Sequence, residues 1–322
     1  MKAARVTEYG GRDVLDVVET EQPDPGEGEV RIDVKAAGIN FADIMQRRGH
    51  YHGGRETPYT PGLEVAGEVD AVGEGVGREP GDRVVTMLDS GGYAEYAVAD
   101  ARGLFDAPDG LSFEEAAGFP VQFLTAHNCL HEWGGLEEGE SVLIHAAAGG
   151  VGSAAVQLAR EAGAEVLGTA STAEKLERAA SLGCNHPINY EEEDFVAVLK
   201  EHTDYGVDLV LDGVGGETTE RSLDALRHFG RMVVYGAASG RPGRPGTDDI
   251  LFGNQRIIGY HLGRALGLKP MKVMGAVPEL SAMLAEGTLD VHVDRAFDLA
   301  NVDDAHAYVE NRESMGKVVI VP

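Results

Sequence analysis

Cysteine is scarce in this sequence, which contains only Cys129 and Cys184 among its 322 residues. Two thiols are too few for a disulfide framework or for a structural zinc site with four thiolate ligands. Uninterrupted apolar runs of membrane-spanning length are missing as well, which predicts a protein that is not embedded in a membrane. With 43% hydrophobic and 25% charged residues, the composition is that of a folded globular protein and excludes the fibrous and disordered classes.

Positive charge is also sparse, since 27 Lys and Arg residues stand against 54 Asp and Glu residues and give a formal net charge of −27. Binding to nucleic acid needs clustered cations, so this composition predicts neither a nucleic-acid partner nor an anionic membrane partner. Two explanations of the acidity stay open. One is an ordinary solvated acidic surface, and the other is adaptation to high salt, where counter-ions screen the repulsion.

The first residues carry no apolar segment, because Glu8 and Tyr9 stand where a secretory signal would need its hydrophobic region. The sequence therefore predicts a cytoplasmic protein.

Two patterns of secondary structure follow one another along the chain. The first 100 residues indicate strands and turns, for example 28–34, where polar and apolar residues alternate. From residue 141 onward, apolar strands alternate with amphipathic helices, which predicts βαβ units on a parallel sheet. Residues 256–261 are expected to form an edge strand, and the methionines Met271 and Met274 are expected in the core of a helix that follows.

A glycine-rich turn, Ala146 to Gly152, follows a predicted strand and opens a predicted helix. Its AxxGxxG pattern is typical of dinucleotide binding: Gly149 allows close approach of a pyrophosphate, and Gly152 allows the helix to pack on the strand. Gly150 and Val151 complete the turn, where the helix N-terminus offers free N–H groups.

The end of the second strand indicates which dinucleotide binds. An acid about 20 residues after the glycines would bind the ribose diol of NAD, but residues 168–172 contain none. Lys175 follows within the first turn of the next helix and is a natural partner for a 2′-phosphate. Ser171 also fits a helix cap, a role compatible with phosphate binding. The residues predict NADPH as cofactor.

Several further segments carry a resemblance over essentially the whole chain: residues 37–43, 61–69, 188–190, 310–312 and 316–317, together with the glycine turn. With them the chain resembles the zinc-independent medium-chain dehydrogenases/reductases of the quinone oxidoreductase family. The resemblance implies an α/β protein with a GroES-like β-rich catalytic domain (1–122 and 264–322), a Rossmann doubly wound parallel-sheet domain (123–263), and an active site in the cleft.

The chain departs from the alcohol dehydrogenase branch of that superfamily at its metal ligands. Asn40 stands where that branch has a zinc-binding Cys, and Leu63 where it has a zinc-binding His. An amide and an alkyl group cannot replace a thiolate and an imidazole on Zn²⁺, so no metal is predicted. A competing metal idea, His127 and His131 near Cys129, lacks an HExxH pattern and also fits an ordinary helix surface.

Without a Lewis-acid metal, the hydride acceptor must itself be electrophilic, as quinones and α,β-unsaturated carbonyls are. The resemblance places Asn40, Asp43 and Tyr51 at the cleft and Thr125 near the nicotinamide. Asn40 and Tyr51 would hydrogen-bond a developing oxyanion. Loop, cap or packing roles stay open for all three cleft residues.

At the other end of the cofactor, the resemblance assigns the 2′-phosphate to the set Ser171, Lys175, Tyr190 and Arg312. Arg312 also fits an ordinary surface cation.

The predicted function is NADPH-dependent reduction of a small quinone or enone. A 2-enoyl thioester reductase and a catalytically idle NADPH-binding sensor or structural protein remain alternatives. We also expect a homodimer, because Ile257 and Ile258 would otherwise leave an apolar sheet edge unpaired.

Overall fold

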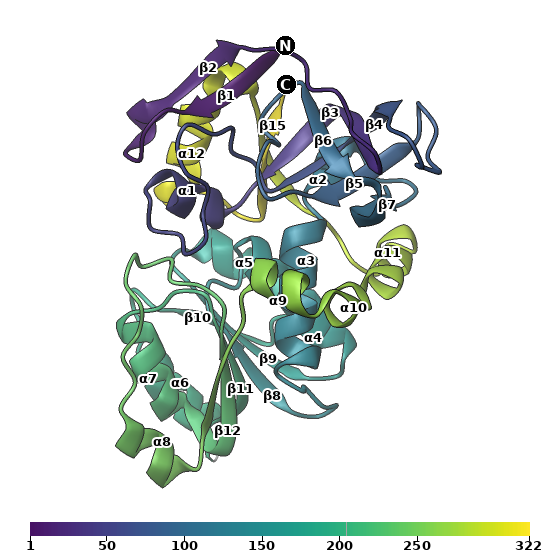
Figure 1. Ribbon diagram of the computed structural model, residues 1–322. Helices are drawn as coiled ribbons and strands as arrows, with labels where there is room; N and C mark the ends of the chain where they lie inside the picture. The colour runs from purple at the N-terminus through teal and green to yellow at the C-terminus, as the bar shows by residue number, and fades with distance from the viewer. Residues whose placement is uncertain (204) are drawn as a thin grey trace. The chain divides into compact units, whose positions relative to one another are not determined.

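A computed structural model describes residues 1–203 and 205–322 of the chain. The chain forms two compact units, one built from residues 1–121 and 281–322 and the other from residues 122–280. The sequence places the return to the first domain at residue 264, whereas the compact units change over at residue 281. Figure 1 labels the helices and strands of both units.

The first unit is β-rich. Its elements are β1 (Lys2–Val6), a 3₁₀ turn (Arg12–Val14), β2 (Leu15–Glu19), β3 (Glu29–Ile39), α1 (Phe41–Arg47), β4 (Glu64–Val72), β5 (Arg83–Met87), β6 (Tyr96–Asp100), a 3₁₀ turn (Ala101–Gly103), β7 (Leu104–Asp106), α2 (Phe113–Ala117), β14 (Val293–Asp298), a 3₁₀ turn (Leu299–Asn301), α12 (Val302–Glu310) and β15 (Lys317–Val321). Helix α11 (Val277–Ala285) spans the point at which the chain returns to this unit.

Both ends of the chain contribute to the main sheet of this unit, whose strand order is β14-β15-β3-β4-β5-β7, with β6 also paired to β3. Strand β3 alternates half-buried and buried residues, as predicted from residues 28–34, so that Val30, Ile32 and Val34 enter the core. Because β15 pairs with β3, the C-terminal strand completes the sheet that the N-terminal part begins.

The second unit alternates strands and helices. The chain enters it within α3 (Pro120–His127), whose first two residues still belong to the first unit. The elements that follow are a π-helical turn (Asn128–Glu132), β8 (Ser141–Ile144), α4 (Gly150–Glu161), β9 (Glu165–Ala170), α5 (Ala173–Leu182), β10 (His186–Asn189), α6 (Phe195–His202), β11 (Val207–Asp212), α7 (Glu217–Ala225), β12 (Leu226–Val234), α8 (Thr247–Gly253), β13 (Arg256–Gly259), α9 (Leu262–Leu268) and α10 (Pro270–Met274).

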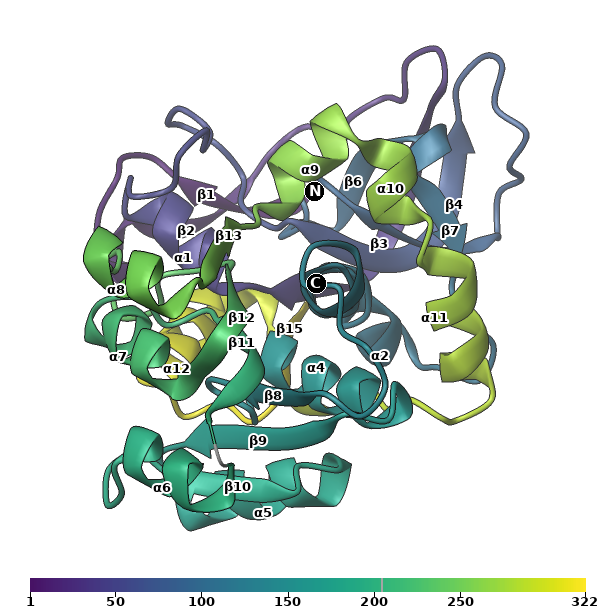
Figure 2. The ribbon, with the colours of Figure 1, turned by 90° about the horizontal axis from the view of Figure 1, so that it is seen from below.

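Its six strands are all parallel and follow the order β10-β9-β8-β11-β12-β13. This order is that of a doubly wound sheet, which confirms the predicted fold class. Helices α4 and α5 pack on β8, β9 and β10, and α7 packs on β11 and β12; Figure 2 shows α5 beside β10. Strand β13 forms one edge, where the sequence predicts an edge strand.

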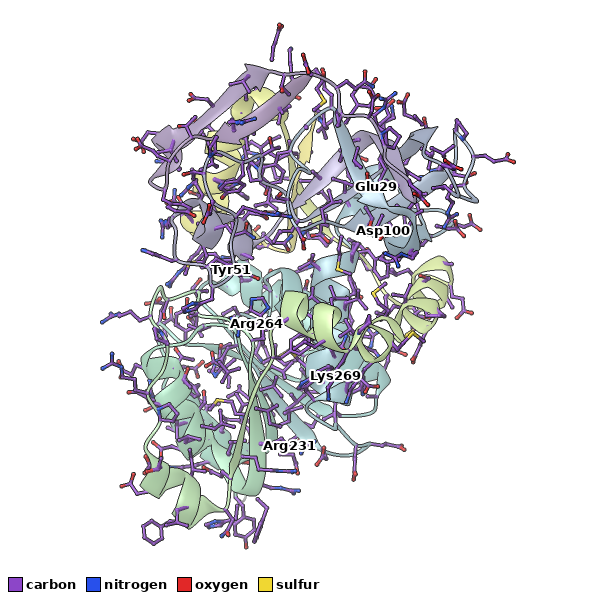
Figure 3. The ribbon with its side chains drawn as sticks, in the orientation of Figure 1. Glu29, Tyr51, Asp100, Arg231, Arg264 and Lys269 are labelled. Carbon is purple, nitrogen blue, oxygen red and sulfur yellow. The ribbon has the colours of Figure 1, made fainter. Side chains whose placement is uncertain are left out.

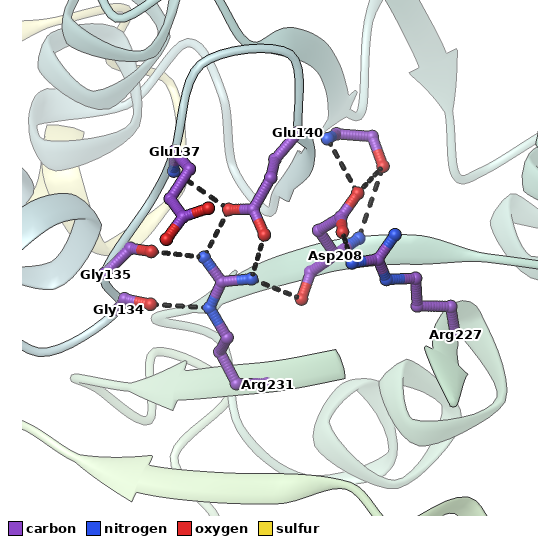
Figure 4. A network of polar contacts seen from close by, with 8 residues as sticks. Gly134, Gly135, Glu137, Glu140, Asp208, Arg227 and Arg231 are labelled. Carbon is purple, nitrogen blue, oxygen red and sulfur yellow. Dashed lines mark hydrogen bonds and ion pairs between the residues drawn. The ribbon is translucent and has the colours of Figure 1, made fainter. Parts of the chain in front are cut away.

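A buried arginine, Arg231, forms hydrogen bonds near the amino ends of the central strands (Figure 4). Arg231 is 5% exposed and donates to the carbonyl oxygens of Gly134 (2.5 Å) and Gly135 (2.7 Å) and to both carboxylate oxygens of Glu140 (2.8 and 2.5 Å). Asp208 accepts from the backbone N–H of Ser141 at 3.0 Å, which ties β11 to β8. These contacts lie at the edge opposite the ligand-binding carboxyl edge of such a sheet and serve stability.

The predicted methionine-bearing helix differs from the structure. It is divided into α10 and α11, and Met271 is 87% exposed, so the prediction that this methionine packs in the core is wrong. The first turn of α10 directs Val273 inward instead, fully buried. Within the part of the chain that is described, no helix is long and apolar enough to span a bilayer.

Candidate functional site

The glycine-rich turn lies between β8 and α4, as predicted. Gly149 is the N-cap of α4 and has extended backbone angles. A Cβ on Gly152 would overlap the carbonyl oxygen of Ala146, so only glycine lets the helix approach the turn this closely. A Cβ placed on Gly149 would lie 3.3 Å from the same oxygen, a milder restriction. Packing alone therefore explains Gly152, whereas Gly149 faces more open space.

The first turn of α4 presents backbone donors. The earliest intrahelical bond runs from the N–H of Ser153 to the oxygen of Gly149 at 2.8 Å. The N–H groups of Gly150, Val151 and Gly152 precede it and have no intrahelical acceptor, and the first two residues are half-buried. Such a turn, with the positive end of the helix dipole behind it, suits a pyrophosphate.

The structure brings three of the predicted 2′-phosphate residues to one edge of the sheet. Ser171 follows β9 directly, and Lys175 is the third residue of α5. The backbone N–H of Tyr190 donates to the oxygen of Ala170 at 3.2 Å, which places Tyr190 beside the end of β9. Thr172, rather than Ser171, caps α5, because its Oγ1 accepts from the N–H of Lys175 at 3.3 Å. The capping role considered for Ser171 is thus corrected.

Arg312 and Thr125 belong to other segments of the chain. Arg312 belongs to the first unit, after α12, where it is exposed and has a left-handed backbone with φ of 59°. Thr125 lies within α3 and is 6% exposed.

The two histidines of the competing metal hypothesis lie with their ring centroids 4.8 Å apart. Burial lowers the pKa of both His127 and His131. Cys129 is fully buried, and its pKa is raised well above the usual value by that burial. Among the described residues, no three His, Cys, Asp or Glu side chains converge as metal ligands.

A buried polar network lies beneath the carboxyl edge of the second sheet. His145, at 2% exposure, contacts Thr169 Oγ1 through Nδ1 (3.0 Å) and Ser222 Oγ through Nε2 (2.9 Å). Because Ser222 donates its own proton to the oxygen of Thr218 at 2.6 Å, Nε2 carries the imidazole proton and Nδ1 accepts from Thr169. Burial lowers the pKa of His145 to about 4, so the ring is neutral.

In the first unit, Asn40 and Asp43 form the N-terminus of α1. The backbone N–H of Asn40 donates to Asp43 Oδ2 at 2.8 Å, and the N–H of Gly62 donates to Asp43 Oδ1 at 3.2 Å. Asp43 is 1% exposed, and burial raises its pKa to about 7. Both carboxylate oxygens are thus used to hold backbone, so Asp43 fixes the loops that carry Asn40 and Leu63.

Two residues to which the sequence assigns no role adjoin Asn40. Lys317 Nζ donates to Asn40 Oδ1 at 2.9 Å and forms an ion pair with Glu64 Oε1. Asn40 Nδ2 in turn donates to Glu64 Oε1 at 2.8 Å. The sequence contains a signal for both, since they lie in segments that carry the family resemblance, but nothing in it shows that they meet. Tyr51, labelled in Figure 3, is half-buried in the loop after α1.

Comparison with known proteins matches each unit to a family. Residues 26–109 match the alcohol dehydrogenase GroES-like domain, and residues 150–282 match the zinc-binding dehydrogenase family. The chain is 37% identical to the 2-haloacrylate reductase of Burkholderia sp., over 99% of this chain and 98% of that protein. It belongs to the medium-chain dehydrogenase/reductase family, quinone oxidoreductase type.

The chain is also similar to two further proteins. The human synaptic vesicle membrane protein VAT-1 homolog is 37% identical over 98% of this chain and 85% of its own length. The crystal structure of Escherichia coli quinone oxidoreductase complexed with NADPH superimposes with a TM-score of 0.93 at 34% identity and covers 100% of both chains. The medium-chain dehydrogenase/reductase fold thus extends over the whole chain, and the protein is an oxidoreductase by family.

Proposed function

We propose that this protein is an NADPH-dependent, zinc-independent reductase that transfers a hydride to quinones or other activated carbonyl compounds. The observation that carries the proposal is the donor set around Asn40. Its amide is engaged by the ammonium of Lys317 and the carboxylate of Glu64, and Leu63 offers only an alkyl group. Because the amide oxygen of Asn40 already accepts from the Lys317 ammonium, and that ammonium is paired with Glu64, the position offers no free donor atom for a divalent metal.

The second unit supports NADPH as the cofactor. The glycine turn fits a pyrophosphate, because Gly152 admits no Cβ and the first N–H groups of α4 have no helical acceptor. Lys175 stands in the first turn of α5, where a cation opposes the helix dipole. A negatively charged 2′-phosphate bound beside Ser171, Lys175 and Tyr190 would offset this unfavourable interaction between the lysine and the helix dipole. Likeness to a quinone oxidoreductase complexed with NADPH points the same way.

NADPH, when bound, supplies the hydride. Nothing in the proposed site polarises an unactivated ketone as a metal would, so the acceptor must be electrophilic by itself. Asn40 contributes an amide N–H to the acceptor oxygen on which negative charge develops, and Tyr51 is its candidate partner. Thr125 is assigned to the nicotinamide end, and Arg312 to the phosphate end, on the family resemblance. Asp43 acts by holding the backbone of the Asn40 loop.

A second candidate acceptor is an activated carbon–carbon double bond. The likeness to 2-haloacrylate reductase favours it, because a haloacrylate is an alkene conjugated to a carboxylate. A long 2-enoyl thioester would be a further member of this class. The cofactor and the Asn40 donor would serve each of these acceptors in the same way, by stabilising negative charge on an oxygen.

The experiment is to mix the purified protein with NADPH and a panel of quinones, enones and enoyl thioesters, and to follow loss of the reduced-nicotinamide absorbance. Turnover of quinones supports the proposal. Turnover confined to enoyl thioesters would replace it with the second candidate. Binding of NADPH without turnover of any acceptor would mean a catalytically idle sensor or structural protein.

Two further properties belong to the proposal. A cytoplasmic location agrees with the two cysteines, both of which are free thiols and buried. A homodimer is proposed through β13, the edge strand of the second unit. Ile257 and Ile258 are only half-buried there, and Leu251 and Phe252 of α8 are 70% and 78% exposed just before it.

A further inference from the structure

A fully sealed ion pair lies inside the first unit. Lys317 is 2% exposed and Glu64 is 0% exposed. The remaining carboxylate oxygen, Glu64 Oε2, accepts from the backbone N–H of Val121 at 2.8 Å. Removing two charges from water carries a large desolvation penalty, and a buried pair is therefore weak evidence for stability. Because stability does not explain the Lys317–Glu64 pair, we look for a role of the pair in function.

Strand register explains how residues so far apart in the sequence meet. Val318 of β15 lies opposite Ile39 of β3, and Ala37 of β3 lies opposite Val65 of β4. Lys317 and Glu64 are the first residues of β15 and β4, and Asn40 follows β3 directly. The sheet therefore brings all three polar side chains to one end of three adjacent strands.

Two glycines leave the space that the lysine occupies. A Cβ on Gly38 would lie 2.6 Å from both Lys317 Cε and Glu64 Oε1. A Cβ on Gly118 would lie 3.1 Å from Lys317 Cγ. Any larger residue at Gly38 would displace the ion pair, so the surrounding backbone is adapted to it.

The ion pair determines which way the Asn40 amide faces. An ammonium can only donate and a carboxylate can only accept, so Oδ1 must face Lys317 and Nδ2 must face Glu64. One N–H of Nδ2 is used by Glu64. Within the described part of the chain, the other N–H makes no hydrogen bond to protein. Asn40 is half-buried whereas Lys317 and Glu64 are sealed, so Asn40 is the member of the cluster that a ligand can reach.

We propose that Lys317, together with Glu64, is a positioning residue that fixes the Asn40 amide so that its second N–H donates to the oxygen of the hydride acceptor. This inference rests on the proposed function. A flipped amide would present its own oxygen to the acceptor oxygen and oppose the negative charge that develops there. Lys317 acts through Asn40 and does not touch the acceptor.

The test is a double-mutant cycle on kcat. Lys317→Met alone would leave a buried carboxylate unpaired, so the variant is Lys317→Met with Glu64→Gln. The introduced glutamine must accept from the N–H of Val121, which leaves its amide nitrogen facing Asn40 and favours the flipped state. We expect kcat to fall about a hundredfold, as when one oxyanion donor is removed, with the KM for NADPH unchanged.

Asn40→Ala should lower kcat by a similar factor in the wild type and by less than about twofold in the Lys317→Met/Glu64→Gln background. If Asn40→Ala lowers kcat by the same factor in both backgrounds, the effects of the two changes are independent and the proposal is overturned. The matched control is Lys35→Met, which removes a lysine paired to Asp33 at 2.7 Å on β3 of the same sheet. It should leave kcat and the melting temperature unchanged.

A second measurement does not depend on turnover or on the double variant folding. In protein labelled with ¹⁵N-asparagine, the Asn40 side-chain signals are those that vanish in Asn40→Ala. One of its two amide protons should be protected from exchange, and the other should shift when a quinone is added to the NADP⁺-bound protein. Equal exchange of both protons would refute the fixed amide. If the wild type reduces no acceptor but the two amide protons are still unequally protected, the proposed function is refuted while the fixed orientation of the Asn40 amide stands.

Discussion

Lys175→Ala offers the sharpest separation between a phosphate-binding lysine and a structural one. The side chain is half-buried at the third position of α5. A charge-assisted hydrogen bond contributes about 1.5–3 kcal/mol, and the partial exposure of this lysine places it near the lower end. At about 1.4 kcal/mol per factor of ten, the KM for NADPH should rise about tenfold, while that for NADH stays within about twofold.

The helix itself should tolerate this change. The cap uses the backbone N–H of residue 175, bonded to Thr172 Oγ1, and alanine keeps that bond. Removing a cation from a helix N-terminus also relieves an unfavourable dipole interaction of about 0.3–1 kcal/mol, which offsets part of the effect of losing the side chain on the free energy of unfolding. Lys200→Ala, an exposed lysine in the last turn of α6, is the matched control and should leave both KM values unchanged.

The assay is steady-state kinetics with each cofactor at two salt concentrations, since screening should reduce the difference between wild type and variant at high salt. Equal losses with NADPH and NADH would refute the phosphate role and assign Lys175 to the helix. A wild-type preference for NADH would overturn the choice of cofactor.

Four further outcomes are expected. Active protein should contain less than stoichiometric zinc by elemental analysis, and loss of activity on chelation would contradict the zinc-independent site. Light scattering should give a homodimer that Ile257→Glu dissociates, and a monomeric wild type would refute pairing through β13. Molar salt should raise the melting temperature, because the Debye length falls from roughly 10 Å at 0.1 M to 3 Å at 1 M; equal melting at both would indicate ordinary surface acidity. The pKa of His145 is about 4 in the folded protein, below the 6.5 of the unfolded chain, so the free energy of unfolding should fall by up to about 3 kcal/mol as the pH drops from 6.5 to 4. In denaturation measured across this pH range, His145→Gln should show a smaller change of the free energy of unfolding with pH, and an unchanged pH dependence would exclude His145 as a contributor.

The sequence predicts the second unit well because its signals are local. Apolar runs separated by amphipathic helices specify parallel strands, and the turn from Ala146 to Gly152 carries its own glycine requirements. Local sequence patterns do not predict which of two adjacent residues caps a helix when both are suitable. Ser171 and Thr172 both suit a helix N-cap, and only the backbone shows that Thr172 performs it.

The contact between Lys317 and Glu64 in the first unit could not be predicted from the sequence. Lys317 and Glu64 are 253 positions apart, and only the registers of β15 on β3 and of β3 on β4 bring them together. Asp43 likewise accepts from the N–H of Gly62, 19 positions away, a contact that no local pattern indicates. The exposure of Met271 shows the converse, since helical spacing alone cannot tell which face of a short helix meets the core.

The central claim is direct hydride transfer from NADPH to an electrophilic acceptor at a metal-free site. NADPH deuterated at one or the other face of C4 measures it in a single-turnover reaction with the best quinone of the panel. We expect a primary kinetic isotope effect from one face only, in protein free of zinc. The absence of an isotope effect from both faces, under conditions where chemistry limits the rate, would contradict direct hydride transfer.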